Sequence, residues 1–325
     1  MAVSVAVVVV TLSSGGMSIG PALLTPFTSY PVLFLAGFML SEPLTLPPRH
    51  WQQLAEAAVV GVLFAVPYSL GPIYSTPELA LLVGNLLAFA VGQRRGIRLD
   101  IVSRRRITPN IVELRFQPAA PVRFDAGQYL ELHVPHRQAD ARGQRRMFSI
   151  ASAPGADDVA IVFRESGSSF KTALATLEPG ARVRATGVWG EFVLPADSSQ
   201  PLLLVAAGIG ITPFLSQLAA LDGTDRDIVL VYAVSDPSEL ELLTGVGLAS
   251  VRVLVVAPEP PVASLPSIVY LGPGRLSRER LAEAVPDLAS RLAWVSGPPA
   301  FVDEIAPALR ALRARRVHTD YFSGY

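Results

Sequence analysis

The stretch Leu202-Leu203-Leu204-Val205-Ala206-Ala207-Gly208-Ile209-Gly210-Ile211-Thr212-Pro213 decides the fold of the C-terminal part of the chain. Its first six residues are a continuous apolar run, which is typical of a strand buried on both faces of a parallel sheet. Glycines let a backbone approach a diphosphate closely, and the first turn of a helix offers unpaired N–H groups to an anion. The order strand, glycine turn, helix therefore predicts a dinucleotide site that includes Gly208, Gly210, Thr212 and Pro213.

Pro213 stands where the common G-x-G-x-x-G fingerprint has its third glycine, so the stretch alone is equally compatible with an ordinary tight turn. The pattern of the surrounding residues predicts the architecture in which this turn lies. Helical patterns at residues 213–221, 277–284 and 301–314 alternate with apolar runs, which is typical of a parallel sheet covered on both faces. We expect an α/β NAD(P)-binding domain at 200–325, with strands at residues 202–207, 228–234, 251–256, 268–271, 292–295 and 317–322.

Upstream, residues 99–194 consist of short β-rich runs separated by turns, with one helical stretch at 169–177. This spacing predicts a small antiparallel barrel. We expect a six-stranded antiparallel β-barrel domain at 97–196, with strands at residues 99–107, 111–116, 129–134, 147–151, 159–163 and 181–188.

One barrel strand carries a cation, an aromatic ring and a hydroxyl in Arg146-Met147-Phe148-Ser149. A guanidinium suits a phosphate, a flat ring suits a flavin face, and a hydroxyl suits the flavin edge. Gly167-Ser168-Ser169-Phe170-Lys171 then opens the barrel's helix and offers a second place for an anion. Ser149 and Ser152 are also compatible with ordinary strand hydroxyls.

These stretches resemble the ferredoxin–NADP reductase (FNR)-like family of flavoenzymes over about residues 97–325. Arg146 to Ser149 resembles the family's R-x-Y-S flavin motif, with Phe148 in place of tyrosine. Gly167 to Phe170 resembles the loop that holds the flavin diphosphate, and residues 124–129 resemble F-x-P-G-Q-Y, with alanine in place of proline. Gly208 to Pro213 resembles the family's G-x-G-x-x-P, which accounts for the proline.

Two further matches lie near the C-terminus. Ser296-Gly297-Pro298-Pro299 resembles the family's C-G-P-P motif beside the nicotinamide, with Ser296 in place of cysteine. Residues 320–325 resemble the aromatic tail that covers the other face of the flavin, although a hydrophobic plug on the last strand is the alternative for this tail.

The resemblance implies an FAD-dependent NAD(P)H oxidoreductase in which a hydride passes from nicotinamide to FAD, and electrons then leave singly to a separate acceptor or a quinone. The implied catalytic residues are Ser149, Ser296 and Phe322. The implied cofactor-binding residues are Gln128, Tyr129, Arg146, Met147, Phe148, Ser149, Gly167, Ser168, Ser169, Phe170, Gly208, Gly210, Thr212, Pro213, Asp236, Gly297, Pro298 and Tyr325.

NADH is favoured over NADPH because Asp236 follows the second strand of the nucleotide domain, where no arginine is at hand to pair a 2′-phosphate. Arg252 is the one residue that weighs against this preference.

The N-terminal part has a different composition. Residues 1–92 contain only four charged side chains, Glu42, Arg49, Glu56 and Glu78. We expect an α-helical membrane segment with about three spans. They are built on three apolar runs: 30–40, which extends back to residue 21; 54–70; and 79–91. The run 2–12 is a fourth candidate or a remnant. One alternative is a cleaved signal peptide at 2–12, although no basic residue precedes this run. The other alternative is that the apolar runs are core helices of a soluble domain.

The arginine cluster at 94–106 predicts a cell-membrane protein whose soluble domains lie on the cytoplasmic side. Residues 38–45 and the spans after them resemble the end of the NqrB/RnfD-type membrane subunit of sodium-pumping NADH:quinone reductases and Rnf complexes. The chain lacks that subunit's S-G-A-T flavin-attachment segment.

Composition limits the partners. The absence of cysteine excludes disulfides and a Cys-ligated iron–sulfur cluster on this chain, and no histidine falls within the apolar runs to ligate a heme. With 27 basic and 27 acidic residues, the chain has no net charge that would attract nucleic acid. No metal site is expected. The expected partners are membrane lipid and a redox acceptor on a separate chain or a quinone. The alternative function is a non-catalytic membrane scaffold or assembly protein with a degenerate flavin site, which the Phe148 and Ser296 departures motivate.

Overall fold

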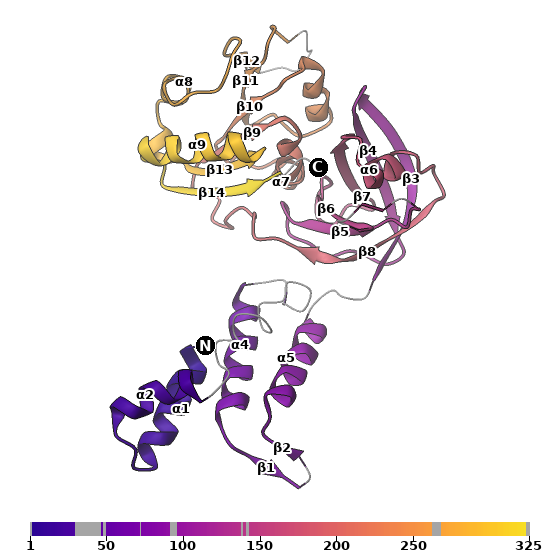
Figure 1. Ribbon diagram of the computed structural model, residues 1–325. Helices are drawn as coiled ribbons and strands as arrows, with labels where there is room; N and C mark the ends of the chain where they lie inside the picture. Colours follow the sequence, from indigo (N-terminus) through magenta and orange to yellow (C-terminus); the bar gives the residue numbers. More distant parts are fainter. Residues whose placement is uncertain are drawn as a thin grey trace. The chain divides into compact units, whose positions relative to one another are not determined.

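The computed structural model describes residues 2–29, 47, 50–71, 73–91, 96–137, 139–140, 143–261 and 268–322. The chain divides into two compact units, Met1–Arg95 and Gly96–Tyr325 (Figure 1).

The first unit is helical. Its described helices are α1 (Ala2–Ser14), α2 (Ile19–Thr28), α4 (His50–Ala65) and α5 (Pro77–Val91), and a small hairpin of β1 (Ser69–Leu70) and β2 (Ile73–Tyr74) joins α4 to α5. Gly84 lets α4 and α5 approach closely, because a Cβ at this position would lie 2.5 Å from Cγ2 of Val60. The two helices thus form an antiparallel pair with a tight contact.

The expectation of three membrane spans is not supported by the described residues, none of whose helices has the length and apolar character needed to cross a membrane. The run 54–70 is interrupted by Pro67, so α4 ends at Ala65 after 16 residues, about 24 Å of helix. The run 79–91 belongs to the 15-residue α5. Residues 30–46, which hold most of the other expected span and the start of the NqrB/RnfD-like stretch, lie outside the described residues.

The expected antiparallel sheet is confirmed. Its order is β6-β5-β8-β3-β4-β7, and an antiparallel bridge between Ile150 and Ile161 brings the two edges together into a barrel. Inward side chains such as Leu114, Phe116 and Leu132 are fully buried and fill its core. The strands are β3 (Ile97–Thr108), β4 (Ile111–Pro118), β5 (Tyr129–His133), β6 (Arg145–Ser149), β7 (Val159–Arg164) and β8 (Arg182–Trp189), and the helix α6 (Ser169–Ala175) follows β7.

The expected parallel sheet is also confirmed, with the order β12-β11-β10-β9-β13-β14 and every pair parallel. Its strands are β9 (Leu202–Ala207), β10 (Ile228–Ala233), β11 (Val251–Val256), β12 (Ile268–Tyr270), β13 (Leu292–Gly297) and β14 (Arg316–Tyr321). The helices are α7 (Thr212–Ala220), α8 (Arg278–Ala284) and α9 (Pro299–Ala311), with short 3-10 turns η2 (Gly208–Ile211), η3 (Pro237–Leu243) and η4 (Leu288–Ser290).

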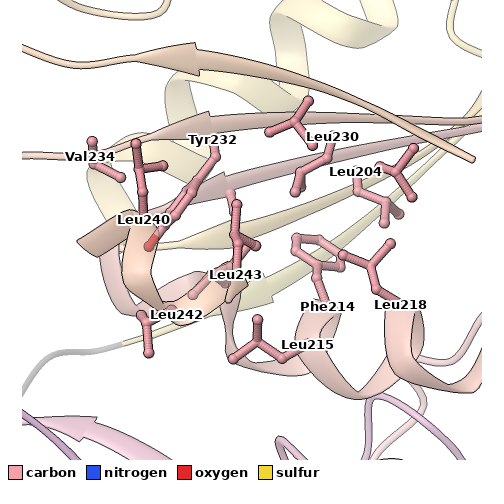
Figure 2. Packing of buried hydrophobic residues seen from close by; sticks show 14 of the residues in the cluster. Leu204, Phe214, Leu215, Leu218, Leu230, Tyr232, Val234, Leu240, Leu242 and Leu243 are labelled. Atoms are coloured by element: carbon pink, nitrogen blue, oxygen red, sulfur yellow. The ribbon is translucent and has the colours of Figure 1, made fainter. Parts of the chain in front are cut away.

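The apolar strands are buried because helices cover both faces of this sheet. Figure 2 shows one face, where Leu204 and Leu230 of the strands lie over Phe214 and Leu218 of α7, and Tyr232 lies toward Leu240 and Leu243 of η3. Residues of opposite parity on the same strands pack with α8 and α9. The continuous apolar runs are therefore explained by two-sided burial.

Buried hydrogen bonds tie α7 to the barrel. The hydroxyl of Ser216 donates to the carbonyl of Ser152 at 2.7 Å, and Nε2 of Gln217 donates to the carbonyl of Phe192 at 2.6 Å. Gly127, at φ +97°, lies against the same carbonyl and amide with no room for a side chain. These contacts hold the two sheets of the second unit in one arrangement and define the cleft between them.

Candidate functional site

A cavity of about 540 Å³ opens between the barrel and the carboxyl end of the parallel sheet. The barrel contributes residues of β5, β6, β7 and α6, and the nucleotide side contributes Ile209 and the end of β14. Six residues expected at the cofactor site line this cavity: Tyr129, Arg146, Met147, Phe148, Ser149 and Phe322. The structure therefore brings the R-x-F-S strand and the C-terminal tail, which lie far apart in the sequence, to the same cavity.

A backbone hydrogen bond anchors the C-terminal aromatic tail. The N–H of Phe322 donates to the carbonyl of Gly297 at 2.8 Å, so the aromatic tail is tied to the Ser296–Pro299 turn. The tail's last expected site residue, Tyr325, lies outside the described residues.

Arg146 is held at the cavity wall. Its guanidinium lies 2.8 Å from the carboxylate of Asp140 and 5.2 Å from the centre of the Phe170 ring. Nearby, the Ser168 hydroxyl caps α6 by accepting the Lys171 N–H at 3.3 Å, after Gly167 turns the chain at φ +71°. This cation and the start of α6 provide the donors that a flavin diphosphate needs, and the residues present therefore fit FAD.

Three expected cofactor contacts are engaged inside the protein. Phe170 is fully buried with its ring stacked on Phe148, the centroids 6.0 Å apart. Gln128 donates from Nε2 to the Gly190 carbonyl at 2.9 Å and accepts the N–H of Asp125 at 2.8 Å. Ser169 meets His136 Nε2 at 3.2 Å. Phe170 and Gln128 therefore do not line the cavity: Phe170 packs against Phe148, which does, and Gln128 links the backbones of Asp125 and Gly190.

The glycine turn packs against the Ser296–Pro299 turn. A Cβ on Gly210 would lie 2.5 Å from the carbonyl oxygen of Ser296 and 2.6 Å from Cα of Gly297. Thr212 is fully buried and its hydroxyl donates to the Ile209 carbonyl at 3.0 Å, while Pro213 is buried in the first turn of α7. Gly210 is thus required for the contact between the two turns. Pro298 precedes α9 as its N-cap.

Ser296 and Asp320 lie side by side at the carboxyl end of the parallel sheet, next to the cavity. They are direct neighbours in the register of β13 and β14, and Asp320 lines the cavity. Burial raises the pKa of the Asp320 carboxyl, which favours its protonated form. The hydroxyl of Ser296 is fully buried and has no hydrogen-bond partner in the part of the chain that the structure describes. The resemblance of residues 320–325 to an aromatic tail predicts no role for this carboxyl.

A second missed group borders the glycine turn. Nη2 of Arg164, at the end of β7, lies 2.9 Å from Oε1 of Glu239, whose side chain is only 1% exposed. A Cβ on Gly208 would lie 3.6 Å from Oε2 of Glu239 and 3.7 Å from Nη2 of Arg164. The Tyr232 hydroxyl donates to the Gly208 carbonyl at 3.0 Å, and burial raises its pKa well above the ordinary value. Only the fold reveals this cluster, because its members belong to four separate segments.

Asp236 caps η3. Its carboxylate accepts the N–H and the hydroxyl of Ser238 at 2.9 and 2.7 Å, and these bonds lower its pKa. Arg252 is the second residue of β11, at the amino end of the sheet, whereas the glycine turn lies at the carboxyl end. Its guanidinium donates to the Ala284 carbonyl. The residue that weighed against NADH is therefore remote from the glycine turn.

An antiparallel barrel, a parallel sheet with a glycine turn, and one ligand-sized cavity between them define a two-domain fold suited to binding a dinucleotide. No family model matches the chain. Curated relatives include the NADPH oxidoreductase of Mycobacterium tuberculosis, 28% identical over 246 residues that cover 73% of this chain and 63% of the relative. The reductase component of propane 2-monooxygenase from Mycolicibacterium goodii is 27% identical, covering 69% of this chain and 65% of the relative. The chain thus spans less than two thirds of the length of these relatives.

Solved structures give the same picture. The cytochrome P450 reductase GcoB of Amycolatopsis matches with a TM-score of 0.58 and 26% identity over 70% of each chain. A ferredoxin NADP+ reductase of Neisseria gonorrhoeae, solved with bound FAD and NADP, matches with a TM-score of 0.57 and 21% identity over 71% of this chain and 99% of its own. These likenesses support the expected FNR-like ferredoxin reductase family and the two-domain fold, and they are consistent with an FAD- and NAD(P)H-dependent oxidoreductase. They give no support to the NqrB/RnfD-like resemblance.

Proposed function

We propose that this protein is a flavin-dependent oxidoreductase that takes electrons from NADH, in preference to NADPH, and passes them through FAD to a separate redox protein or a quinone. The observation that carries the proposal is the shared cavity. It brings Arg146, Phe148 and Ser149 of the barrel together with Asp320 and Phe322 of the nucleotide side.

Residues on different walls of the cavity would contact different parts of a bound FAD. Arg146 would hold the FAD diphosphate, Phe148 would pack beside the flavin ring, and the Ser149 hydroxyl would donate a hydrogen bond to the ring edge. Phe322 excludes water from the opposite side. When bound, FAD accepts an electron pair from reduced nicotinamide and releases electrons one at a time.

The polar end of the cavity handles protons. The Asp320 carboxyl, whose pKa is raised by burial, holds a proton at neutral pH more readily than an ordinary aspartate. The buried Ser296 hydroxyl stands opposite it in the β13–β14 register with unused hydrogen-bonding capacity. These two groups offer hydrogen bonds to a nicotinamide that enters beside the glycine turn.

The proposed preference for NADH rests on two carboxylates, Asp236 and Glu239, that follow β10. Asp236 caps η3, and the buried Glu239, which pairs with Arg164 through Oε1, has its Oε2 close to Gly208 and without a hydrogen-bond partner among the described residues. A carboxylate accepts hydrogen bonds from a ribose diol and repels a 2′-phosphate.

An anaerobic absorbance titration of the FAD-loaded protein with NADH and then NADPH tests this function. We expect one equivalent of NADH to bleach the flavin band and NADPH to act more slowly. Protein that does not retain FAD would overturn the proposal. Protein that retains FAD but is reduced by neither nucleotide would select the second candidate, a non-catalytic scaffold with a degenerate flavin site, which the phenylalanine at 148 and the serine at 296 favour.

For localisation, we propose that the first unit associates with the cell membrane and that the second unit lies on the cytoplasmic side. Most of the exposed large apolar side chains of the described residues belong to the first unit, including Leu24, Trp51, Leu54 and Leu86. Apolar surface of this extent favours contact with lipid. Flotation of the protein with phospholipid vesicles tests this, and a protein that stays at the bottom of the gradient would contradict it.

A further inference from the structure

A histidine outside the recognised motifs contacts the start of α6. His136 follows β5, and its Nδ1 lies 2.9 Å from the carbonyl oxygen of Val134, while its Nε2 lies 3.2 Å from Oγ of Ser169. The imidazole also meets the buried Phe170 ring edge to face, with the ring centroids 5.9 Å apart. The ring of His136 is therefore held between its own loop and the first residues of α6.

These contacts fix which ring nitrogen carries the proton when the imidazole is neutral. A backbone carbonyl only accepts hydrogen bonds, so Nδ1 of His136 donates to Val134. A neutral imidazole has one N–H, and Nε2 is then an acceptor. The hydroxyl of Ser169 has a single proton, and in this state it donates that proton to Nε2. Only lone pairs of the hydroxyl then face other ligands, and lone pairs repel a phosphate oxygen.

Protonation of His136 reverses this hydrogen bond. Both ring nitrogens of an imidazolium are donors, so Nε2 donates to Oγ of Ser169 while Nδ1 keeps its bond to Val134. The hydroxyl proton of Ser169 can then turn away from the ring and donate to an anion. The imidazolium also places a positive charge at this hydroxyl, and charge-assisted hydrogen bonds are the stronger ones.

The surroundings of Ser169 indicate which anion its hydroxyl meets. Phe170, the next residue, has the guanidinium of Arg146 over its ring at 5.2 Å from the centre. Lys171, one residue further, lines the cavity together with Arg146. These cations are the groups expected beside the flavin diphosphate, so the ligand that a donating Ser169 hydroxyl would meet is a diphosphate oxygen.

The titratable groups around this pair of residues are few. The charged side chains of the segments that carry His136, Ser169 and the residues against them include Arg137, Asp140, Arg145, Arg146 and Lys171. His133 is a second histidine on the same segment, and its Nε2 lies 3.4 Å from Oε1 of Gln144. Histidine is the residue type whose charge ordinarily changes between pH 5 and pH 8. A change at Ser169 in this range is therefore assigned to His136, the histidine that contacts it.

We propose that His136 is a positioning residue of the flavin site, which sets the direction of the Ser169 hydroxyl and strengthens FAD binding when its imidazole is protonated. This inference rests on the proposed function and deepens it, because it assigns the protonation state in which the diphosphate site is complete. The step breaks no bond in FAD: His136 takes one proton from solvent. By linkage, the affinity for FAD rises as pH falls through the range in which this histidine gains its proton.

The test measures the Kd of FAD for the full-length protein by flavin-fluorescence titration between about pH 5.5 and pH 8. The variant His136→Gln keeps a side-chain N–H donor but cannot become charged, and Ser169→Ala removes the hydroxyl. The matched control, His133→Gln, makes the same replacement at the histidine that contacts Gln144. Thermal unfolding of each variant at each pH shows that it is folded.

We expect wild type to bind FAD about tenfold more tightly at pH 5.5 than at pH 8, which is the order of effect of one charge-assisted hydrogen bond. His136→Gln should bind FAD with the same Kd at both pH values. Ser169→Ala should lose affinity at pH 5.5 and little at pH 8. His133→Gln should keep the wild-type pH profile.

Three results would overturn the proposal. The first is a wild-type Kd that does not change with pH. The second is a loss of affinity in His136→Gln that is equal at every pH together with an unchanged profile, because this identifies a packing role alone. The third is loss of the pH profile in His133→Gln. If His136→Gln does not fold, the profiles of wild type, Ser169→Ala and His133→Gln decide the question.

Failure of the proposed function gives a different signature. Protein that binds FAD with the expected pH profile but is not reduced by NADH supports the role of His136, although the oxidoreductase assignment fails. Protein that NADH reduces but whose Kd for FAD is independent of pH contradicts the role of His136 and leaves the assignment intact. Protein that binds no FAD at any pH overturns both.

Discussion

The contact between the glycine turn and the Ser296–Pro299 turn sets the geometry of the nucleotide site, and the variant Gly210→Ala tests this. The added Cβ would lie 2.5 Å from the Ser296 carbonyl oxygen, 2.6 Å from Cα of Gly297 and 2.7 Å from its nitrogen. Ordinary contacts lie near ~3.5 Å, so the two turns must separate by about 1 Å. All three neighbouring atoms are backbone, and no flexible side chain can absorb the shift.

A misplacement of about 1 Å lowers a rate by roughly 10²-fold, and overpacking of this kind costs about 1–3 kcal/mol. We therefore expect Gly210→Ala to slow flavin reduction by NADH about 100-fold in stopped-flow absorbance. Its unfolding temperature should fall by about 2–4 °C for each kcal/mol lost. FAD should remain bound, because Arg146 and α6 belong to the barrel.

Gly96→Ala is the matched control, since the nearest atom to its added Cβ is the Ala185 carbonyl oxygen at 3.9 Å. This variant should reduce its flavin at the wild-type rate. If Gly210→Ala also kept the wild-type rate and KM for NADH, the close contact between the turns would have no role in placing the nicotinamide.

Three further variants address single groups. Arg146→Ala removes a charge-assisted contact worth about 1.5–3 kcal/mol and should weaken FAD binding roughly 10- to 100-fold in a flavin-fluorescence titration, whereas an unchanged Kd would exclude Arg146 from the diphosphate site. Glu239→Gln should raise the NADPH-to-NADH ratio of kcat/KM by about tenfold, more than Asp236→Asn does, and an unchanged ratio would remove Glu239 from ribose recognition. Asp320→Asn tests the carboxyl whose pKa is raised by burial. The ionised form is disfavoured in the folded state, so wild type loses stability relative to the variant as pH rises above the carboxyl's unfolded pKa, and the two should converge in acid. Thermal unfolding between about pH 4 and pH 8 measures this, and a pH-independent difference would contradict it.

Much of the fold was predictable because the local pattern of apolar and polar residues indicates which segments form strands and which faces are buried. The run Leu202–Ala207 is apolar at every position, and that pattern requires burial on both faces of a sheet. The alternation along β5, with Leu130 and Leu132 buried and Tyr129 and Glu131 partly exposed, likewise predicts one wall of a barrel. In the first unit, apolar runs predicted spans, whereas the described helices are too short for this; Pro67, for example, ends α4 after 16 residues.

The sequence by itself determined the order of the two sheets, the glycine turn and the residues of the R-x-F-S strand, since each depends on neighbours a few positions away. Only the tertiary structure decided that Asp320 enters the cavity beside Ser296, that Arg164 reaches Glu239 beneath Gly208, and that His136 meets Ser169. The physical reason is that these contacts join segments tens of residues apart, and strand register, which no local pattern encodes, selects which side chains meet.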